Sequence, residues 1–335
     1  SYLGLTRPRS SDCEIAEMSL AIGLVLLLLL VPWILLLILT FLPRKSCSIA
    51  GTRCAVTGAS EGLGALIALH LAQRGVEKLV LGARRMEKLE QVKADVLKQV
   101  PTVEVVLVKL DLRDSESRRH FSAVASENSC NVLVNNAGVD KNAFFEKMTD
   151  DDVDLMLDTN LSATIKLTRQ FLKMMLEASG GHIVNVASVA GQVPVPFGVV
   201  YATSKAGLRQ FSASLRSELI YEKKPVTVHS VSPGLVADAG LAADREERLG
   251  STIRRAAGVF GWTTPQRVAE AVVQAVEYDE PDIVVNFPNV RYAYAGMFAF
   301  PRAYENAIGV LRFLGLDAPL RFFRKDAIYE AGLRQ

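Results

Sequence analysis

A glycine-rich turn set between a strand pattern and a helix pattern most constrains the fold of this 335-residue chain. The turn reads TGASEGLG from Thr57 to Gly64, follows the apolar run 54–56 and precedes apolar positions at helical spacing up to Gly75. Glycines let a backbone approach a pyrophosphate closely, and a helix N-terminus stabilises its negative charge. Glycines also make ordinary tight turns, but this order of strand, turn and helix indicates a dinucleotide site.

Strand and helix patterns alternate along the rest of the chain. The alternation predicts an α/β, Rossmann-like fold: a doubly wound, mainly parallel sheet with helices on both faces. Strands are expected at about 54–56, 78–85, 105–112, 132–138 (ending in a small-residue turn), 182–186, 226–232 and 283–287, and helices at about 86–99, 115–126, 151–178, 201–221 and 265–277.

The end of the second strand bears on the choice of dinucleotide. Where a protein that binds NAD places an acid for the ribose hydroxyls, this chain has Ala83 followed by Arg84. An arginine suits the 2′-phosphate of NADP(H), and a missing carboxylate removes repulsion against it. The pattern therefore predicts NADP(H), although solvated arginines at a strand end are the alternative. Asp111 is expected to face the adenine, and Asn135 and Asn136 to bond backbone groups around the pocket.

Tyr201 and Lys205 form the second informative motif, with Ser188 thirteen residues before the tyrosine. On a helix, residues four apart project from one face, which brings the lysine ammonium beside the phenol. A free tyrosine has a pKa of about 10, and a neighbouring positive charge lowers it. The pair therefore indicates an acid/base centre, with the Ser188 hydroxyl holding a carbonyl or alcohol oxygen; an incidental surface pair is the alternative.

The chain resembles the short-chain dehydrogenase/reductase family over about residues 52–287. The resemblance rests on five motifs in the family's order: the glycine turn Thr57–Gly64, Asn135–Gly138, Asn160, Ser188 with Tyr201 and Lys205, and Pro233-Gly234. The resemblance implies that Tyr201 is the general acid/base and that Ser188 polarises the substrate oxygen. It implies that Lys205 lowers the pKa of the tyrosine and holds the nicotinamide ribose. Asn160 would hold a water that relays protons from Lys205 to solvent; taken alone, it would rather cap or kink a helix.

The motifs and the resemblance assign a larger set of residues to NADP(H). They are Gly58, Ser60, Glu61, Gly62, Leu63, Gly64, Arg84, Asp111, Leu112, Asn136, Ala137, Gly138, Tyr201, Lys205, Pro233, Gly234 and Val236. Asp238 stands where the family commonly has a threonine that contacts the nicotinamide carboxamide, which puts that contact in doubt. No metal site is expected.

The implied reaction interconverts a ketone or aldehyde and an alcohol by hydride transfer. The layout is similar to that of membrane-anchored 3-ketodihydrosphingosine reductases and of anchored hydroxysteroid and retinol dehydrogenases. It suggests a lipophilic substrate of 3-ketosphinganine, ketoacyl, retinoid or steroid type. The alternative is a non-catalytic NADP(H)-binding scaffold or sensor at a membrane.

An apolar segment near the N-terminus predicts a membrane anchor. No charged residue occurs between Glu17 and Arg44, and the 23 residues 20–42 would span about 35 Å as a helix, enough to cross a bilayer core. A cleaved signal peptide and a buried soluble helix are the alternatives. The expected division is a tail at 1–17, a transmembrane anchor at 18–43, the catalytic domain at 50–288 and an apolar extension at 289–335.

Charges on either side of the segment bear on its orientation. Arg44, Lys45 and Arg53 follow it, and Arg7 and Arg9 precede it, which favours a cytosolic catalytic domain. Four cysteines without a paired spacing suit a reducing compartment. The expected location is the endoplasmic reticulum membrane, with a role in lipid metabolism.

Two C-terminal regions are expected to set the substrate. Residues 239–261 correspond to a mobile lid in the family, and the apolar stretch 290–323 suits a membrane-surface segment, a tunnel wall, a core segment or a dimer face. A homodimer is a further possibility that the family suggests. The formal net charge of +2 is too near neutral to imply nucleic-acid binding.

Overall fold

The computed structural model describes residues 46–141, 143–195, 197–236 and 262–285, with helical pieces between residues 18 and 35. The chain divides into two units, Ser1–Lys45 and Ser46–Gln335. Asp238, the expected lid at 239–261 and the apolar extension at 289–335 lie outside the described residues, so the predictions made for them stay predictions.

The first unit contains the predicted membrane anchor. Its described pieces are helical, and their large apolar side chains from Met18 to Leu35 are exposed. Among the described residues, no helix has both the length and the apolar character needed to cross a bilayer. Residues 36–43 of the predicted anchor lie outside the described part, so the anchor remains an expectation from the sequence.

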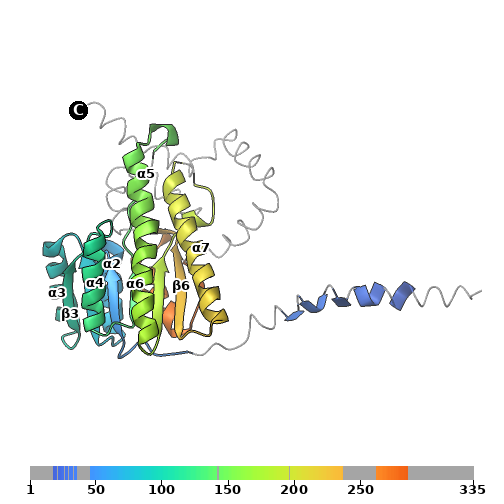
Figure 1. The fold of residues 1–335 in the computed structure, drawn as a ribbon, viewed down its shortest axis with the longest axis horizontal. Coiled ribbons are helices and arrows are strands. Elements are labelled where there is room, and N and C mark those ends of the chain that lie inside the picture. Colours follow the sequence, from blue (N-terminus) through green and yellow to red (C-terminus); the bar gives the residue numbers. More distant parts are fainter. Residues whose placement is uncertain are drawn as a thin grey trace, which may run out of the picture. The chain divides into compact units, whose positions relative to one another are not determined.

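The described part of the second unit contains a seven-stranded parallel sheet in the order β3-β2-β1-β4-β5-β6-β9 (Figure 1). The strands are β1 (Arg53–Thr57), β2 (Lys78–Ala83), β3 (Glu104–Lys109), β4 (Val132–Asn135), β5 (Gly181–Val186), β6 (Val226–Pro233) and β9 (Asp282–Val285). A second, two-stranded sheet pairs β7 (Leu235–Val236) with β8 (Trp262–Thr263). The strand order reverses between β1 and β4, and in such sheets ligands bind at the carboxyl ends of the strands beside this point.

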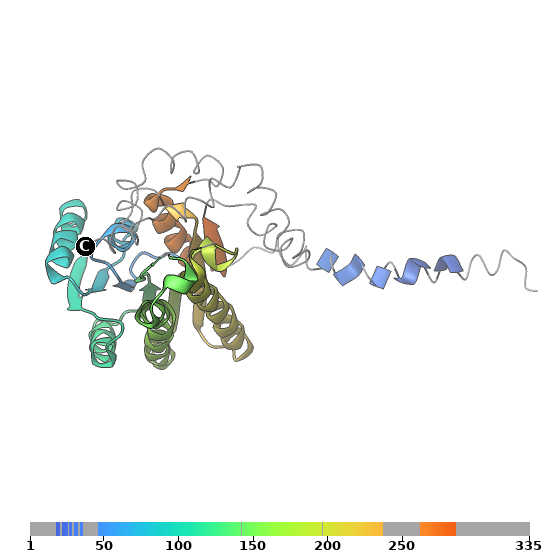
Figure 2. The same cartoon turned by 90° about the horizontal axis from the view of Figure 1, so that it is seen from above.

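Helices cover both faces of the sheet, which confirms the predicted Rossmann-like class (Figure 2). One core cluster joins the sheet to α2 (Gly62–Gln73), α3 (Met86–Gln99) and α10 (Pro265–Glu277), and the other joins it to α4 (Ser115–Glu127), α6 (Ala163–Glu177) and α7 (Val199–Tyr221). Consecutive strand residues alternate between the clusters: Cys54 and Val56 belong to the first, Ala55 to the second. Both faces are therefore buried, as expected for a parallel sheet.

The predicted helix at 151–178 is interrupted, which the sequence pattern did not indicate. It consists of α5 (Asp150–Leu157), a π-helical turn η2 (Asp158–Ser162) and α6. In this turn the Ala163 N–H bonds to the Asp158 carbonyl, five residues back. The Thr164 hydroxyl donates to the Thr159 carbonyl at 3.3 Å. The π turn therefore adds one residue to the helix at Asn160, a predicted site residue.

The predicted third strand is also too long. It ends at Lys109 and not at residue 112, because Asp111–Asp114 make a turn into α4. The Asp114 carboxylate closes this turn by accepting the N–H groups of Glu116 and Ser117 at 3.2 and 2.9 Å. Asp114 thereby caps the N-terminus of α4.

Two histidines, the buried His229 and the half-buried His182, connect the first half of β5 and β6 to the residues just before the edge strand β9. His229, fully buried, has its Nδ1 2.8 Å from the Glu280 carbonyl and its Nε2 2.9 Å from the Thr227 hydroxyl. The same hydroxyl lies 2.7 Å from Nδ1 of His182. Since the carbonyl only accepts, His229 donates from Nδ1 and accepts from Thr227 at Nε2. Burial lowers the pKa of His229 to about 4.

This arrangement predicts a specific acid sensitivity of the fold. Because His229 has a lower pKa folded than its ordinary value of 6.5, the unfolded chain takes up protons first as the pH falls. The free energy of unfolding should fall by about 2 kcal/mol between pH 6.5 and 5 from this group alone. Urea denaturation at both pH values should show that the free energy of unfolding of His229→Gln falls by about 2 kcal/mol less than that of wild type. His120→Gln, at an exposed position on α4, should keep the full loss; equal losses in all three proteins would contradict the assignment.

Candidate active site

The glycine turn between β1 and α2 packs too tightly for side chains. Gly58 has φ +66°, and a Cβ built on it would lie 2.7 Å from the Ala137 Cα. A Cβ on Gly64 would lie 2.2 Å from the Gly58 carbonyl oxygen. Both positions therefore require glycine, because three segments pack closely here: the glycine turn after β1 (the β1 turn), the turn after β4 (the β4 turn) and α2. Gly62, with φ +54°, begins the helix.

The N-terminus of α2 suits an anionic ligand. Its N-cap residue Glu61 makes no side-chain hydrogen bond to the first helical N–H groups, whereas α4 and α10 are capped in this way by Asp114 and Thr264. Uncapped N–H groups together with the helix dipole form an anion site. The turn thus fits the pyrophosphate that the sequence predicted there.

Hydrogen bonds hold the β4 turn against the β1 turn. The Thr57 hydroxyl oxygen accepts the N–H groups of Asn136 and Ala137, both at 3.1 Å. In return the Asn136 side-chain amide donates to the carbonyls of Thr57 and Gly58 at 3.1 and 3.3 Å. Asn136 therefore bonds backbone groups, as expected from the sequence. Thr57 is a residue that sequence reasoning missed, although it stands first in the glycine motif.

A cluster of charges borders the glycine turn, and it contains Arg85, which sequence reasoning did not select. The Arg85 guanidinium contacts the Glu61 carboxylate and lies 3.4 Å from the Ser60 hydroxyl. Lys88 donates to the same carboxylate at 2.6 Å. These bonds, the one from Arg85 above all, lower the pKa of Glu61. The cluster presents two cations at the place expected for a phosphate, with one internal carboxylate between them.

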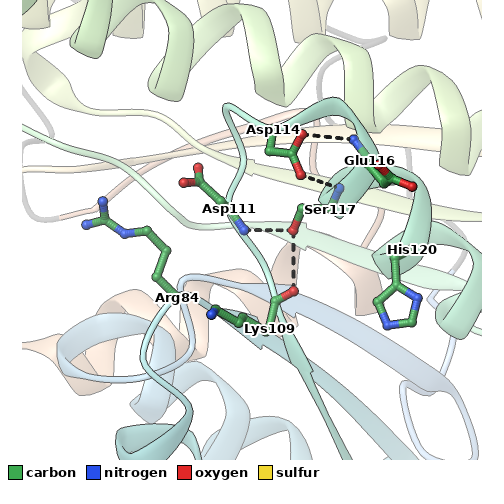
Figure 3. A pocket seen from close by; sticks show the side chains of 7 residues that line it. All are labelled: Arg84, Lys109, Asp111, Asp114, Glu116, Ser117 and His120. Carbon is green, nitrogen blue, oxygen red and sulfur yellow. Dashed lines mark hydrogen bonds between the residues drawn. The ribbon is translucent and has the colours of Figure 1, made fainter.

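Arg84 and Asp111 line a cleft of about 550 Å³ at the ends of β2 and β3. Figure 3 shows the Arg84 guanidinium and the Asp111 carboxylate on one side of this cleft and His120 on the other. Asp111 is fixed from both sides, since Ser117 accepts its N–H and its carboxylate accepts the Arg113 N–H, each at 2.9 Å. Leu112, the next predicted contact, is buried and its carbonyl accepts from Arg118. The cleft fits the adenosine end of a dinucleotide.

Asn160 lies in the π turn and is fully buried. Its side-chain oxygen accepts the Val139 N–H and its NH2 group donates to the Val139 carbonyl, both at 2.8 Å. The same NH2 group lies 3.1 Å from the Ser204 hydroxyl. The amide thereby connects three segments: the turn after β4, the π turn and α7. Ser204 is a residue that sequence reasoning missed, although it precedes the predicted Lys205 directly.

Lys205 is 4% exposed, and its ammonium donates to the Val186 carbonyl at the end of β5 at 2.9 Å. Burial lowers the pKa of this lysine to about 8, with the charge of Asp140 acting in the opposite direction. Its Nζ lies 5.8 Å from the centroid of the Tyr201 ring. A Cβ built on Gly138 would lie 3.4 Å from the same nitrogen. Tyr201, Lys205 and the β4 turn therefore meet at one place.

Ser188 caps the N-terminus of the short helix η3 (Val189–Gly191). Its hydroxyl accepts the Ala190 N–H at 3.1 Å, and a Cβ on Gly191 would lie 2.7 Å from the backbone carbon of Lys205. The turn that carries Ser188 thus packs directly on α7. The other predicted site residues lie at the end of the neighbouring strand: Pro233 ends β6 and Val236 ends β7. Between them, the Gly234 N–H bonds to the Val285 carbonyl at 3.3 Å.

Asn135 does not bond backbone groups, contrary to the prediction. Its amide donates to the Thr168 hydroxyl at 3.0 Å and to the Asn185 side-chain oxygen at 2.8 Å. Asn185 in turn donates to Ser212 on α7 at 2.8 Å. Neighbouring strand residues point to opposite faces, so the Asn135 side chain lies on the face of the sheet that α6 and α7 cover. It bonds to α6 directly and to α7 through Asn185. Among the described residues, no cluster of side chains suits a metal ion.

Comparisons with known proteins agree with this geometry. A family model described as "short chain dehydrogenase" matches residues 53–249. The ketoacyl reductase HetN of Nostoc sp. is 32% identical, over 71% of this chain and 80% of its own length. The NADP-dependent 3-hydroxy acid dehydrogenase YdfG of Salmonella typhi is 34% identical, over 65% of this chain and 86% of its own. A crystal structure of an actinorhodin polyketide ketoreductase with NADPH has a TM-score of 0.65 at 26% identity and covers 73% of this chain and 99% of that one.

The burial of Lys205 predicts a stability cost with a defined pH dependence. Because its pKa falls from 10.5 to about 8 on folding, the charged form destabilises the folded state below pH 8. Lys205→Met, which also loses one hydrogen bond, should therefore raise the free energy of unfolding at pH 7 by about 2 kcal/mol. The advantage should shrink as the pH rises from 8 to 10.5, since the folded wild type releases its proton first.

The measurement is urea denaturation of both proteins at pH 7, 9 and 10. Lys166→Met, at an exposed position on α6, serves as the matched control and should match wild type at every pH. A Lys205→Met protein that is less stable than wild type, or an advantage that does not change with pH, would contradict the assigned cost of burial.

Proposed function

The chain belongs to the short-chain dehydrogenase family, and we propose that it is an NADP(H)-dependent oxidoreductase that interconverts a carbonyl and an alcohol on a lipophilic substrate. The observation that carries the proposal is the meeting of Tyr201, Lys205 and Asn160 at the carboxyl ends of β4 and β5. This place adjoins the glycine turn, since Ala137 lies against Gly58 and its neighbour Gly138 lies against Asn160 and Lys205. An acid/base centre beside an anion site is what hydride exchange with a dinucleotide needs.

Three features support NADP(H) as the cofactor. The second strand ends at Ala83, without an acid, and Arg84, Arg85 and Lys88 follow it. YdfG is named as NADP-dependent, and the ketoreductase structure contains NADPH. The turn from Gly58 to Gly64 would hold the pyrophosphate, and the cleft at Asp111 the adenine. When bound, the nicotinamide supplies or accepts the hydride.

The protein's own residues would move the proton. Lys205 carries its charge near neutral pH because its pKa, though lowered, is about 8. An ammonium beside a phenol stabilises the ionised phenol, so Tyr201 is prepared to give a proton to a carbonyl oxygen or to take one from an alcohol. Ser188 would hold that oxygen. Asn160 fixes the turn at Val139 and Gly138, which keeps Lys205 in place and leaves a route for a proton toward solvent.

The lipophilic substrate class is supported by apolar residues near this centre and by the chain's N-terminus. Phe144 is partly exposed and pairs with Phe197, four residues before Tyr201. Residues 20–42 are almost wholly apolar, which supports a membrane anchor, and the basic residues Arg44, Lys45 and Arg53 after it favour a cytosolic catalytic domain. We place this anchor in the endoplasmic reticulum membrane as part of the same proposal. A 3-ketosphinganine, ketoacyl, retinoid or steroid ketone would fit this setting.

Tyr201→Phe tests the reaction. Removing the hydroxyl should lower turnover roughly 10²–10⁴-fold, because the proton transfer loses its acid. The affinity for NADPH should stay close to that of wild type. Consumption of NADPH with a panel of lipid ketones measures the first quantity, and NADPH fluorescence titration the second. A variant that keeps wild-type turnover would exclude Tyr201 as the proton donor.

Arg84→Ala and Arg85→Ala test the choice of cofactor. Each should raise the dissociation constant of NADPH about tenfold or more, the usual weight of a charge-assisted hydrogen bond, and leave that of NADH nearly unchanged. Fluorescence titration of both cofactors measures this. Arg169→Ala, an exposed arginine on α6, is the control that should change neither value. Equal weakening of NADPH and NADH would remove the assignment of these arginines to the 2′-phosphate.

A further inference from the structure

Two segments far apart in the sequence meet beside the candidate active site. The first follows the β4 turn and contains Phe144; the second leads from η3 into α7 and contains Phe197. The Ala143 N–H donates to the Phe197 carbonyl at 3.0 Å. The rings of Phe144 and Phe197 form an edge-to-face pair with centroids 4.9 Å apart and planes at 83°. This geometry is a favourable one for two aromatic rings.

The first segment is fixed at both ends. At Val139 it bonds twice to the buried Asn160 amide, and at Ala143 it bonds to the backbone of Phe197. The Phe144 ring is thereby held by the same contacts that hold Gly138 beside Lys205. The position of the ring is therefore linked to the geometry of the acid/base centre.

The backbone of Phe197 is strained. Its φ is +66°, in a region that bulky side chains rarely occupy because it is sterically unfavourable for them. The residue lies two positions before α7 begins and four before Tyr201. Such strain persists only where the surroundings hold it, and it concentrates at functional sites. Here the bond from Ala143 and the ring of Phe144 hold it.

The ring pair is not part of the core. Phe144 is 38% exposed, and Val199, the first residue of α7, is 44% exposed. The Lys147 ammonium lies 5.5 Å from the centroid of the Phe144 ring. The pair leaves part of its apolar area in water, and that part adds nothing to the stability of the fold. It would gain stability when an apolar ligand covers it.

We propose that Phe144 and Phe197 select the substrate: their ring pair forms an apolar wall that binds the hydrocarbon chain next to the reacting carbonyl. The proposal rests on the proposed function and narrows it to ketones or aldehydes with an extended alkyl or fused-ring portion. The wall contributes to binding in the ground state and the transition state alike, so its loss raises KM more than it lowers kcat.

The test compares a methyl ketone of long alkyl chain with its short homologue on the full-length chain in detergent micelles. In Phe144→Ala, kcat/KM for the long ketone should fall about tenfold or more, mainly through KM, and that for the short ketone less than about threefold. Tyr221→Ala, which removes a fully surface-exposed ring at the other end of α7, should change neither. Equal losses for both ketones, or no loss for the long one, would overturn the proposal.

Phe197→Gly separates the role of the ring in substrate binding from its effect on the stability of the fold. Glycine accepts the positive φ without strain, so this variant should melt at or above the temperature of wild type while losing the long ketone as Phe144→Ala does. A stable Phe197→Gly protein that keeps the wild-type preference for the long ketone would overturn the proposal.

A binding measurement keeps this test independent of turnover. Titration of the long-chain alcohol into the NADP-loaded protein should give a dissociation constant about tenfold higher in Phe144→Ala than in wild type. A wild type that consumes no NADPH with any ketone would contradict the proposed function and leave the wall to be judged by this binding difference. A wild type that turns over, with equal alcohol binding in both proteins, would contradict the wall alone.

Discussion

The side-chain amide of Asn160 is the interaction on which the rest of the site depends. It pairs with both backbone groups of Val139 and reaches the Ser204 hydroxyl, so one buried group positions the β4 turn, the π turn and α7 together. Buried backbone groups must be paired, and no apolar residue could replace this amide without leaving an N–H and a carbonyl unsatisfied. Gly138 beside Lys205, and Phe144 farther along, take their positions from it.

The same region shows how function opposes stability in this fold. Burial of Lys205 lowers its pKa and so disfavours its charged form, and Phe197 is held at a positive φ that glycine adopts more readily. Both residues lie four positions from Tyr201 in the sequence. Both costs are offset by the two large apolar clusters on the faces of the sheet, and by the side-chain network from Asn135 through Asn185 to Ser212. A rigid scaffold therefore carries a locally unfavourable site, which is the usual arrangement in enzymes.

The sequence predicted those features that depend on local pattern. The helices Met86–Gln99 and Pro265–Glu277 have the predicted bounds, because amphipathic spacing and a proline at the first turn mark them. The direction of side chains at the end of a strand was harder to predict: Asn136 bonds the backbone as predicted, but Asn135 bonds side chains. Arg84 lines the cleft at Asp111, and Arg85, which the sequence did not single out, contacts Glu61 in the glycine turn. Ser204, Thr57 and the Phe144–Phe197 pair were missed because their roles depend on partners distant in the sequence.

The π turn at Asp158–Ser162 has a consequence for how this chain can vary. In a regular α-helix one extra residue would rotate all later side chains by about 100°. A π turn takes up that residue in a single wider turn, so the helix continues in phase beyond it. Deleting one residue of the turn would leave a continuous α-helix over α5 and α6, but it would remove the widened turn that presents the Asn160 amide to both backbone groups of Val139. This stretch of mid-chain helix therefore tolerates substitution far better than a change of length, the reverse of what holds for a surface loop.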